Sequence, residues 1–377
     1  IGELFLREIV PYYPVDRLIR YSTTQSSVDN NLMSWCGFET YVDQVKMSTL
    51  PMISSYDDWK IRNFKLPGLV DKIQKIIDKN SIDMIWAVLN SSITIHLVEK
   101  LMGKISLPII STVWDTPQYF AINFHLSENS QNYLYQHYSK VLKNSLRISV
   151  ISEQMSTIFK KKYRVNSLIL RHGINRKLWR KNNNCLSDKF IIGFAGSLYA
   201  KDAWNAFIKS IESLNGIIEN KQVVLKFIGR FPKTIAKKSK FIELRGSMTM
   251  GETIKSLSEV NIAYLPYWFD KKFEYIVKTA FPGKLSTYLA ADIPIFYHGP
   301  IDSTPTKFMS KYPIGICCHS LDKFEILKAL KTFVSEIYLD QRFESGRKNA
   351  LENELSSDVM LQQFASLIDV KREVFLS

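Results

Sequence analysis

The sequence has few cysteines and no long uninterrupted apolar run, and both absences restrict its class. The four cysteines form no CxxC pair, which disfavours a zinc ribbon or a disulfide framework and favours a reducing, cytoplasmic setting; they are Cys36, Cys185, Cys317 and Cys318. No apolar run reaches the roughly 18 to 20 residues that span a bilayer, and no signal-peptide pattern is visible at the start. We therefore expect no transmembrane helix.

Several catalytic signatures are also missing. The sequence contains neither a Walker A motif nor a complete GxGxxG, which argues against an ATPase and a simple dehydrogenase. It has no Asp-x-Asp, the usual carboxylate pair for a metal–diphosphate complex. Its six histidines show no HExxH or other ligand spacing. We expect neither a metal site nor a bound cofactor.

The composition predicts a folded protein that binds a polyanion. Hydrophobic residues make up 46% and charged residues 23% of the 377 residues, so wholesale disorder is excluded. At roughly 150 residues per domain, two domains fit best. The formal net charge of +14 suits nucleotide phosphates, an anionic membrane face or nucleic acid, and does not choose among them.

Short apolar runs alternate with amphipathic segments in two series, which predicts parallel βαβ units and two Rossmann-like domains. The expected strands are Ile82–Leu89, Pro108–Trp114, Ser145–Ile151 and Ser167–Leu170, then Phe190–Ala195, Val223–Ile228, Asn261–Leu265 and Pro294–Tyr297. The expected helices are Pro67–Lys79, Ser92–Met102, Glu128–Lys143 and Glu153–Tyr163, then Ala203–Ile218, Gly251–Ser258, Pro282–Ala291 and Leu321–Ile337.

A polar run, Asn175–Lys189, separates the two series and suits an exposed connection. We expect an N-terminal domain over residues 1–174, a C-terminal domain over 190–355 and a helical tail over 356–377. Gly2–Val10 is typical of a glycine turn that opens a helix, but no strand precedes it. Because the chain also begins with Ile1, we expect native residues to be missing there.

Two segments of the second series could hold phosphate. In Phe190–Trp204 a buried strand leads through Gly196-Ser197 into a helix, so backbone N–H groups and Lys201 could meet an anion. Arg230 follows the next strand, where ligands of open α/β sheets bind. A plain strand–helix turn and solvated side chains remain the alternative at both places.

The segment Thr279–Pro294 carries a second lysine. Pro282 suits a first helical turn, and Gly283 permits close backbone approach. Lys284 and Thr287 are three positions apart and share a helix face. A helix start that carries a lysine suits a phosphate; an ordinary capped helix is the alternative.

Two further features have open interpretations. Asp115 follows a buried strand and precedes a turn proline, so it either orients an acceptor hydroxyl in an interdomain cleft or caps a helix. The aromatic segment Tyr267–Ile276 is either a lid whose rings stack on a sugar or base, or a loop packed against helices.

Together these segments resemble the nucleotide-sugar glycosyltransferases of the GT-B fold, especially the large retaining group called family 4. The similarity is concentrated in residues 152–294. It rests on Ser152-Glu153, Leu168–Ile174, Gly193–Lys201, Val260–Pro266 and Phe281–Pro294, of which the last opens with an FPxK-type variant of the family motif. The resemblance implies an α/β GT-B fold with two Rossmann-like domains facing across a cleft. It also implies a C-terminal helix that crosses back to the first domain.

The resemblance places the donor nucleotide on the C-terminal domain. It implies that Lys201 and Arg230 contact the diphosphate and stabilise its charge during catalysis, with Ser197 beside them. The remaining donor contacts that it implies are Gly2, the stretch Arg245–Met248 at the base, the backbone at Gly283, Lys284 and Leu285, and Thr287.

The sequence departs from the family at two places. The family commonly carries two glutamates eight positions apart, and here Thr279 and Thr287 stand at those positions, so a ribose-binding carboxylate is missing. The family's His-Asp pair near the acceptor appears as Trp114-Asp115. Asp115 is carried over as the catalytic carboxylate on the acceptor side.

The resemblance implies a hexosyltransferase that moves a sugar from a nucleoside-diphosphate-sugar to a glycan or lipid-linked acceptor in bacterial surface polysaccharide synthesis. The sugar would be transferred with retention and without a metal. The positive charge would hold the protein to the anionic inner face of the membrane. Two alternatives stay open: a DNA-modifying glycosyltransferase, which the net charge suits, and a non-catalytic GT-B binding subunit, which the missing glutamates suit.

Overall fold

The computed structural model describes residues 9, 13–24, 39–182, 188–231, 239–336 and 341–369. Contacts divide the chain into two units: Ile1–Arg171 with Leu361–Ser377, and His172–Met360. The sequence predicted that the first domain ends at residue 174 and that the tail begins at residue 356. The observed divisions fall between residues 171 and 172 and between residues 360 and 361. The expected glycine turn at Gly2 lies outside the described residues. No helix among the described residues is long and apolar enough to cross a membrane.

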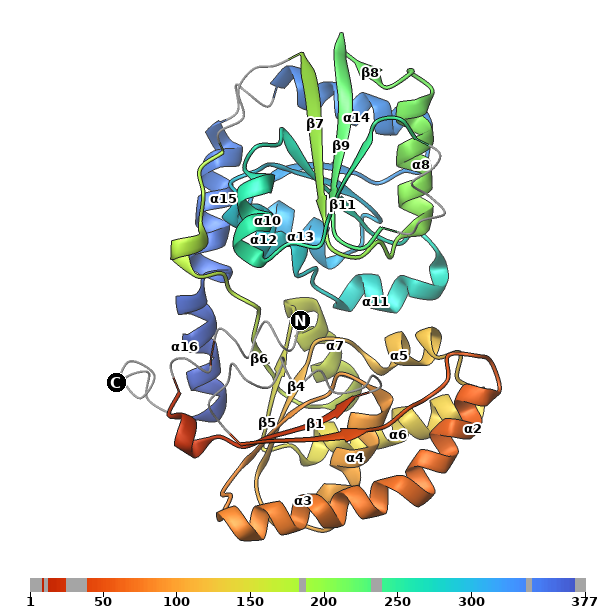
Figure 1. Ribbon diagram of the computed structural model, residues 1–377, viewed down its shortest axis with the longest axis vertical. Helices are drawn as coiled ribbons and strands as arrows, with labels where there is room; N and C mark the ends of the chain where they lie inside the picture. Colours follow the sequence, from red (N-terminus) through yellow and green to blue (C-terminus); the bar gives the residue numbers. More distant parts are fainter. Residues whose placement is uncertain are drawn as a thin grey trace. The chain divides into compact units, whose positions relative to one another are not determined.

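The first unit contains a four-stranded parallel sheet in the order β3-β4-β5-β6 (Figure 1). Its strands are β3 (Ile85–Val88), β4 (Ile109–Val113), β5 (Arg147–Val150) and β6 (Leu168–Ile169). The helices between them are α4 (Ser92–Met102), α5 (Pro117–Asn123), α6 (Glu128–Asn144) and α7 (Glu153–Tyr163). Three of these helices begin at a serine whose Oγ accepts a backbone N–H three residues on, namely Ser91, Ser127 and Ser152.

The segment before that sheet holds two strands and a helix that the sequence did not predict, ahead of the helix that it predicted over Pro67–Lys79. Strands β1 (Arg20–Thr24) and β2 (Thr40–Gln44) pair in parallel, and a short 3₁₀ turn, η2 (Val15–Arg17), precedes them. Helix α2 (Ile53–Lys60) continues through a π-helical turn, η4 (Ile61–Lys65), into α3 (Leu66–Asn80). The apolar face of α3 joins a core that includes Leu69, Ile73, Ile77, Ile93 and Leu97.

The second unit is built on a larger sheet in the order β10-β9-β7-β11-β12-β13, in which all neighbours are parallel. The strands are β7 (Lys189–Ala195), β9 (Lys221–Ile228), β10 (Ile242–Gly246), β11 (Ile262–Pro266), β12 (Ile295–His298) and β13 (Gly315–Cys318). Their carboxyl ends therefore share one edge of the sheet. This arrangement confirms the predicted α/β class with parallel strands.

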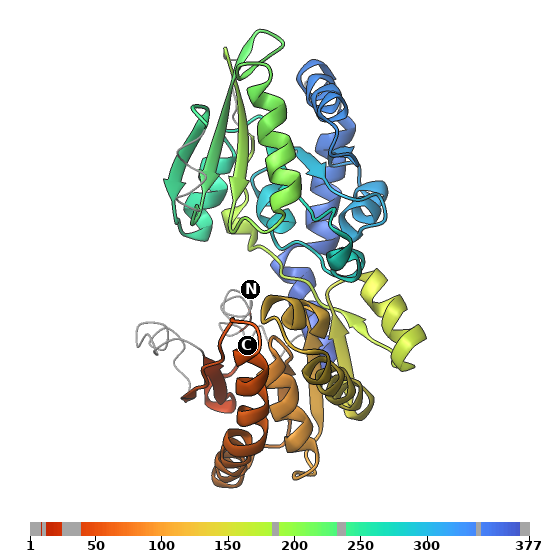
Figure 2. The same ribbon diagram turned by 90° about the vertical axis from the view of Figure 1, so that its right-hand side faces the viewer.

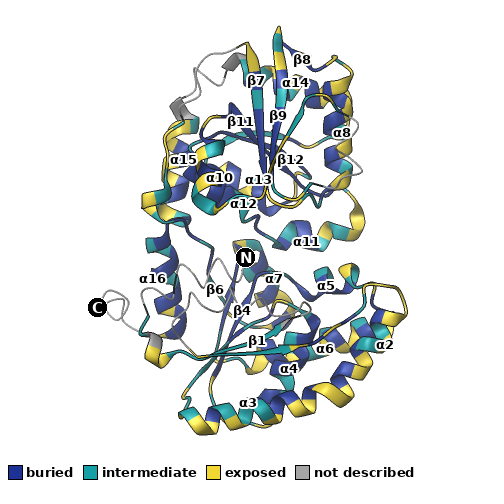
Figure 3. Cartoon of the chain, in the orientation of Figure 1, coloured by how far each residue is buried: buried dark blue, intermediate teal, exposed yellow. Residues whose placement is uncertain are grey.

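Helices cover both faces of this sheet. Helix α8 (Lys201–Glu212) packs beside α14 (Lys323–Glu336) over a buried aromatic cluster that includes Trp204, Phe207 and Tyr264. Figure 2 shows α8 in green alongside the yellow-green strand β7. On the other face lie α10 (Met250–Leu257), α12 (Lys284–Ala290) and α15 (Gln341–Glu354). The strands between the two layers are largely buried (Figure 3).

One predicted helix ends early. The pattern predicted a helix over Ala203–Ile218, but α8 ends at Glu212. Asn215 and Gly216 adopt positive φ angles of 53° and 75°, which a helix cannot continue through. The following Ile217–Ile218 forms β8, which pairs antiparallel with β9. The prediction was wrong because the apolar residues of this short strand extend the helical spacing.

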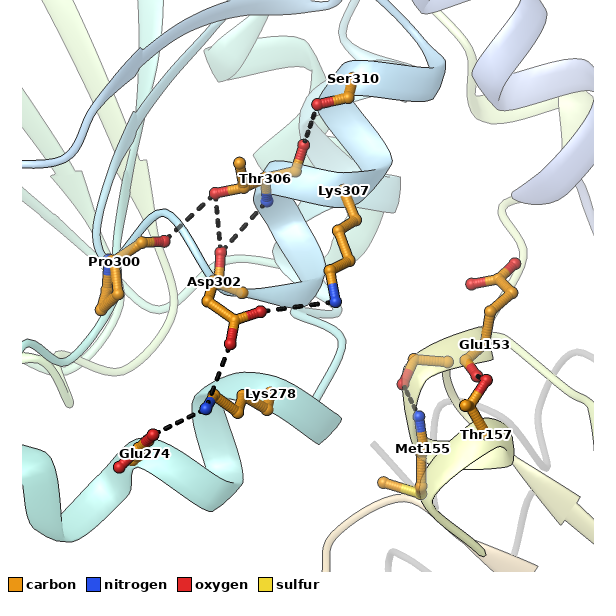
Figure 4. Close-up of polar contacts among 12 residues, drawn as sticks. Glu153, Met155, Thr157, Glu274, Lys278, Pro300, Asp302, Thr306, Lys307 and Ser310 are labelled. Atoms are coloured by element: carbon orange, nitrogen blue, oxygen red, sulfur yellow. Dashed lines mark hydrogen bonds and ion pairs between the residues drawn. The ribbon is translucent and has the colours of Figure 1, made fainter. Parts of the chain in front are cut away.

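Ion pairs join the two short helices before and after β12. Helix α11 (Glu274–Thr279) presents Lys278, which lies 2.6 Å from Glu274 and 3.1 Å from Asp302 (Figure 4). Asp302 also lies 3.4 Å from Lys307 on α13 (Thr304–Lys311). These contacts stabilise the position of α11, the helix that leads into the Phe281–Lys284 segment. The other short helical turns are η5 (Arg176–Leu178) and η6 (Lys271–Phe273).

The predicted C-terminal helix is present in its described part. Helix α16 spans Ser357–Ile368, and residues 370–377 of the predicted tail lie outside the described residues. Its apolar residues Phe364 and Leu367 are buried. From Leu361 onward the helix belongs to the first unit, where the Phe364 ring packs 4.7 Å from Trp86 on β3.

Candidate functional site

The carboxyl ends of β7 and β9 meet at two glycines. Gly196 follows β7 and Gly229 follows β9, with φ angles of 94° and 135° that side chains rarely adopt. A Cβ on Gly229 would lie only 2.7 Å from the carbonyl oxygen of Gly196. The Gly196 N–H donates to Ile228 O at 2.8 Å. Glycine at these two positions lets the turns after neighbouring strands approach each other closely.

The turn from β7 into α8 leaves polar backbone groups available. Within the described part of the chain, the N–H groups of Ser197 and Leu198 have no hydrogen-bond partner, and Ser197 is exposed. Helix α8 has no side-chain cap, and the exposed Lys201 is its first residue. A lysine at the positive end of a helix is electrostatically unfavourable by itself. An anion bound at this turn would compensate for both features.

Lys284, which comes from the start of α12, lies against this turn. Its Nζ donates a hydrogen bond to Ser197 O at 3.0 Å. The ammonium also lies 4.2 Å from the ring centre of Tyr199 and 5.2 Å from that of Phe194, both on the β7 side. A Cβ on Gly196 would lie 3.3 Å from Lys284 Cε. Residues 87 positions apart thus build one cationic corner at the sheet edge.

Burial lowers the pKa of Lys284 from its usual value near 10.5 to about 7, because desolvation penalises the ammonium. The described residues place no carboxylate within ion-pair distance of its Nζ. A bound phosphate would supply the missing countercharge. Lys284 is therefore a lysine whose charged form an anionic ligand would stabilise.

Hydrogen bonds fix the position of α12 relative to the strands. The Tyr288 hydroxyl accepts from Ala195 N at 3.1 Å and donates to Tyr264 O at 3.2 Å, so it joins α12 to the end of β7 and to the middle of β11. Ser286 Oγ donates to His172 O at 2.9 Å. With both contacts, α12 holds Lys284 at the turn rather than in open solvent.

The aromatic segment after β11 packs onto the same turn. Tyr267 is only 2% exposed and Trp268 9% exposed, and the Trp268 ring lies 4.6 Å from that of Tyr199. Asp202 accepts hydrogen bonds from the backbone of Phe269 at 2.7 Å and Asp270 at 3.0 Å, which anchors the loop to the start of α8. For the Tyr267 and Trp268 rings, the structure therefore agrees with a packed loop rather than with an open lid.

Other predicted donor-side residues lie along the same edge. Arg230 is exposed and follows Gly229 directly. Met248 is partly buried and lies in the turn between β10 and the capping box that Thr249 and Glu252 form at α10. The neighbouring Arg245 pairs with Glu243 on its own strand.

The remaining predicted donor contacts have other partners or lie outside the description. Thr287 is buried, and its hydroxyl contacts Met250 Sδ at 3.6 Å. The Leu285 N–H donates to Pro282 O at 3.0 Å and so is already used. Gly283 has an ordinary helical φ of −58°, a conformation that any residue can adopt. Gly2 lies outside the described residues.

Asp115 lies in the first unit, immediately after Trp114 at the end of β4. The helix that follows, α5, begins after Thr116, so Asp115 does not act as its N-cap. Burial raises the pKa of the Asp115 carboxyl to about 6. The neighbouring side-chain oxygens Thr116 Oγ1 and Gln118 Oε1 are buried, and neither has a hydrogen-bond partner among the residues that the structure describes. A polar ligand would satisfy these three groups.

The described residues contain no group of three or more His, Cys, Asp or Glu side chains placed to hold a metal ion. What they do show at this sheet edge is cationic and aromatic: Lys284 lies on the Tyr199 ring, Lys201 stands at the start of α8, and Arg230 follows the turn after β9. This combination binds phosphate oxygens and flat rings rather than metals.

Comparison with solved structures identifies the architecture. HepE of Anabaena, solved with UDP-glucose, matches with a TM-score of 0.69 at 12% identity, over 98% of this chain and 96% of that chain. Sucrose-phosphate synthase of Thermosynechococcus elongatus matches with 0.66 at 12% identity, over 95% and 99%. WaaG, a glycosyltransferase involved in lipopolysaccharide biosynthesis, matches with 0.57 at 10% identity, over 97% and 96%.

The chain has the GT-B fold. Its similarity to GT-B glycosyltransferases extends over nearly the whole sequence, whereas the sequence resemblance was concentrated in residues 152–294. No protein-family model and no curated protein sequence matches the chain. At 10–12% identity, the structural likeness establishes the fold of this GT-B protein and not its substrates.

Three residues of the GT-B site were missed or left without a role at the sequence level. Tyr199 carries the ring under Lys284, Asp202 anchors the aromatic loop, and Tyr288 joins two strands. The sequence pattern indicated no role for the Tyr288 hydroxyl. A tyrosine close after a Gly-Ser turn is a weak local signal, and its lysine partner lies 85 positions away.

Proposed function

We propose that this GT-B protein is a glycosyltransferase that moves a sugar from a nucleoside-diphosphate-sugar to a glycan or lipid-linked acceptor. The fold supports it, because similar solved structures include glycosyltransferases and one complex with UDP-glucose. The net charge of +14 supports an anionic donor. In the finer proposal, transfer proceeds with retention, without a metal, and in bacterial surface polysaccharide synthesis.

The observation that carries this proposal is the position of Lys284. Its Nζ lies 3.0 Å from Ser197 O at the carboxyl edge of the parallel sheet, where open α/β folds bind ligands. The lysine is desolvated, and the N–H groups of Ser197 and Leu198 beside it lack partners among the described residues. A diphosphate would satisfy both needs at once.

The proposed chemistry is mainly electrostatic. As the bond from the sugar to the diphosphate breaks, negative charge develops on the leaving phosphate oxygens. Lys284, Lys201 and Arg230 would stabilise that charge, and the helix start of α8 would add to it. Fixed positive groups in a poorly solvated site stabilise such charge better than water does. This role requires no metal ion.

Asp115 is proposed to act on the acceptor. In its ionised form the carboxylate would accept a hydrogen bond from the acceptor hydroxyl and orient it for attack. The unpartnered Thr116 and Gln118 oxygens would accept further hydroxyl groups. A sugar or polyol presents several hydroxyl donors and suits this set of acceptors.

The direct test is a donor panel. UDP-, GDP- and dTDP-sugars are incubated with the protein, and hydrolysis or transfer is followed by mass spectrometry of the products. We expect at least one donor to be turned over and the Lys284→Ala variant to lose most of that turnover. The Lys209→Ala variant, which removes an exposed lysine from the far end of α8, serves as the control. Absence of turnover and of nucleotide binding for the whole panel would remove the proposal.

A non-catalytic GT-B subunit is the second candidate, and one observation favours it. No carboxylate stands at either of the family's glutamate positions: the Thr279 hydroxyl bonds to Tyr275 O at 2.7 Å, and the Thr287 hydroxyl contacts Met250. Lys201→Ala and Lys284→Ala separate the candidates. An enzyme loses turnover in these variants, whereas a binding subunit shows none in the wild type and keeps its partner binding.

A further inference from the structure

The helical segment from α2 through η4, together with Met52 before it, presents five apolar side chains to solvent, while its Ile61 joins the core. Met52 is 84% exposed, Phe64 69% and Tyr56 59%. Trp59 and Ile53 are nearly half exposed. Ile53, Tyr56 and Trp59 follow one another at spacings of three, so they share one side of α2, and Met52 directly precedes that helix. We call these five residues the aromatic face. Figure 3 shows the exposed segments of α2 in yellow.

The opposite side of the same segment is polar and buried. Asp58 is 1% exposed, and its carboxylate accepts from Arg62 Nε at 2.9 Å. His96 Nε2 of α4 lies 3.4 Å from the other oxygen of Asp58. Ser54 donates to His125 O, and Ser55 accepts from Ser127 N. The segment therefore reverses the usual amphipathic arrangement, and its polar contacts fix that orientation.

The rings of the aromatic face touch one another rather than the core. The Trp59 ring is stacked on Tyr56 at 6.0 Å and meets the edge of Phe64 at 5.5 Å. Contiguous exposed apolar side chains of this kind mark an interaction site rather than ordinary surface. Several neighbouring apolar side chains offer an extended contact surface, which suits an extended apolar partner.

The charged side chains of this part of the sequence are mainly positive. Residues 46–68 contain four basic side chains and two carboxylates. Both carboxylates are engaged: Asp57 accepts from Ser48 N at 2.8 Å, and Asp58 bonds to Arg62. Lys60 and Lys65 flank the aromatic face and are exposed, with Lys65 donating to Gln44 O. An approaching surface therefore meets apolar rings rimmed by lysines.

We propose that the aromatic face docks the protein onto an anionic lipid bilayer. Helices that lie in the bilayer interface bury aromatic and aliphatic side chains among the lipids and extend lysines to the anionic headgroups. A second copy of this chain is the less favoured occupant, because two such faces would bring their lysines together. The inference deepens the proposed function, because it places the proposed sugar transfer at a membrane surface. The biological role of docking rests on the proposed function, whereas the docking itself does not.

The experiment is flotation of the full chain with vesicles. Vesicles of phosphatidylcholine with about one third phosphatidylglycerol are compared with phosphatidylcholine alone. We expect binding to the anionic vesicles that weakens as salt is raised, because the lysines contribute through screened attraction. Brominated lipids should quench part of the tryptophan fluorescence, and Trp59→Phe should remove most of that quenching.

A matched pair of double variants locates the surface. Met52→Ser/Phe64→Ser should lower the vesicle partition coefficient by about tenfold, because two exposed apolar side chains are lost. Leu321→Ser/Phe324→Ser removes two exposed apolar side chains, 42% and 72% exposed, from the second unit and should leave the coefficient unchanged. The substituted side chains are exposed, and melting curves check that both variants fold.

Three results would overturn the proposal. The first is absence of flotation with anionic vesicles. The second is equal flotation of wild type and Met52→Ser/Phe64→Ser. The third is a concentration-dependent dimer in sedimentation that this double variant abolishes, which would make a second copy the occupant. Nucleotide binding measured on the same preparations keeps the two proposals separate. If the protein binds nucleotide but not vesicles, the membrane-docking proposal fails and the proposed function stands.

Discussion

At the scale of single residues, Lys284 links structure to ligand chemistry most directly. With its pKa lowered to about 7, Lys284 is largely neutral at pH 8 in the free protein. A bound diphosphate favours the ammonium, so nucleotide binding at pH 8 should take up a proton. Calorimetry in buffers of different ionisation enthalpy measures this uptake. Lys284→Met should reduce it and weaken binding by about ten- to a hundredfold. Unchanged proton uptake in the variant would contradict the assignment.

Asp115 gives a second pH dependence, which comes from a raised carboxyl pKa rather than from a lowered lysine pKa. Its carboxyl pKa is raised to about 6, so the carboxylate that would orient the acceptor is lost as pH falls through 6. We expect the transfer rate to fall with it. Asp115→Asn should lower transfer by about tenfold or more and remove this acidic limb, while donor binding stays intact. A transfer rate with the same pH profile in wild type and variant would rule out the role.

At the scale of elements, sequence patterns predicted the helices that begin at a serine cap and the strands buried on both faces. Helices α4 and α7 match their predicted bounds. The patterns failed where apolar residues are exposed or the element lies at an edge. Strand β10 lies at the sheet edge, and Leu244 within it is 48% exposed. Helix α2 turns its apolar side outward, so its pattern did not indicate a core-facing helix.

The close approach of the turns after β7 and β9 gives an element-scale prediction. Gly229→Ala places a Cβ 2.7 Å from Gly196 O at a φ of 135°. It should lower the free energy of unfolding by about 1–3 kcal/mol or more and weaken nucleotide binding, because the Ser197 turn must shift. Urea denaturation and calorimetry measure both effects.

Gly68 provides the control for that variant. It lies in α3, and a Cβ there would meet nothing within 4 Å. Gly68→Ala should raise the free energy of unfolding by about 0.5–1 kcal/mol, because alanine favours the helix. If Gly229→Ala were as stable as wild type and bound nucleotide equally well, the two turns would not depend on each other as the structure indicates.

At the scale of the whole molecule, buried histidines should make the protein sensitive to acid. Burial lowers the pKa of His172 and His298 to about 4, and that of His137 below its usual value. The unfolded chain binds these protons near pH 6.5. Between pH 6.5 and 4 it therefore binds more protons than the folded chain, and stability falls as pH falls.

Thermal melts across this range test the expectation. Asp115 contributes the opposite sign, because its raised pKa makes the folded chain bind the proton first. Because three histidines lower the stability as pH falls and one carboxyl group raises it, we expect a net loss of stability. His298 bonds through both ring nitrogens, to Tyr264 and Ser320, and His298→Gln should flatten the dependence. A melting temperature that stays constant from pH 6.5 to 4.5 would contradict this account.

The whole-molecule architecture was predictable because two series of alternating strands and helices recur along the chain. The candidate site was predictable only in part. Local motifs identified Lys284 and the Gly196-Ser197 turn, but not that the two touch, because 87 positions separate them. The ring of Tyr199 and the anchor Asp202 matter through tertiary contacts that no local pattern encodes.

Calorimetric titration of the folded protein with UDP, GDP and dTDP, wild type beside Lys284→Met and Lys209→Ala, tests the central claim most directly. The account predicts saturable binding of at least one nucleotide to wild type and Lys209→Ala, and clearly weaker binding to Lys284→Met. Binding of none of the three nucleotides, or equal affinity in wild type and Lys284→Met, would contradict it.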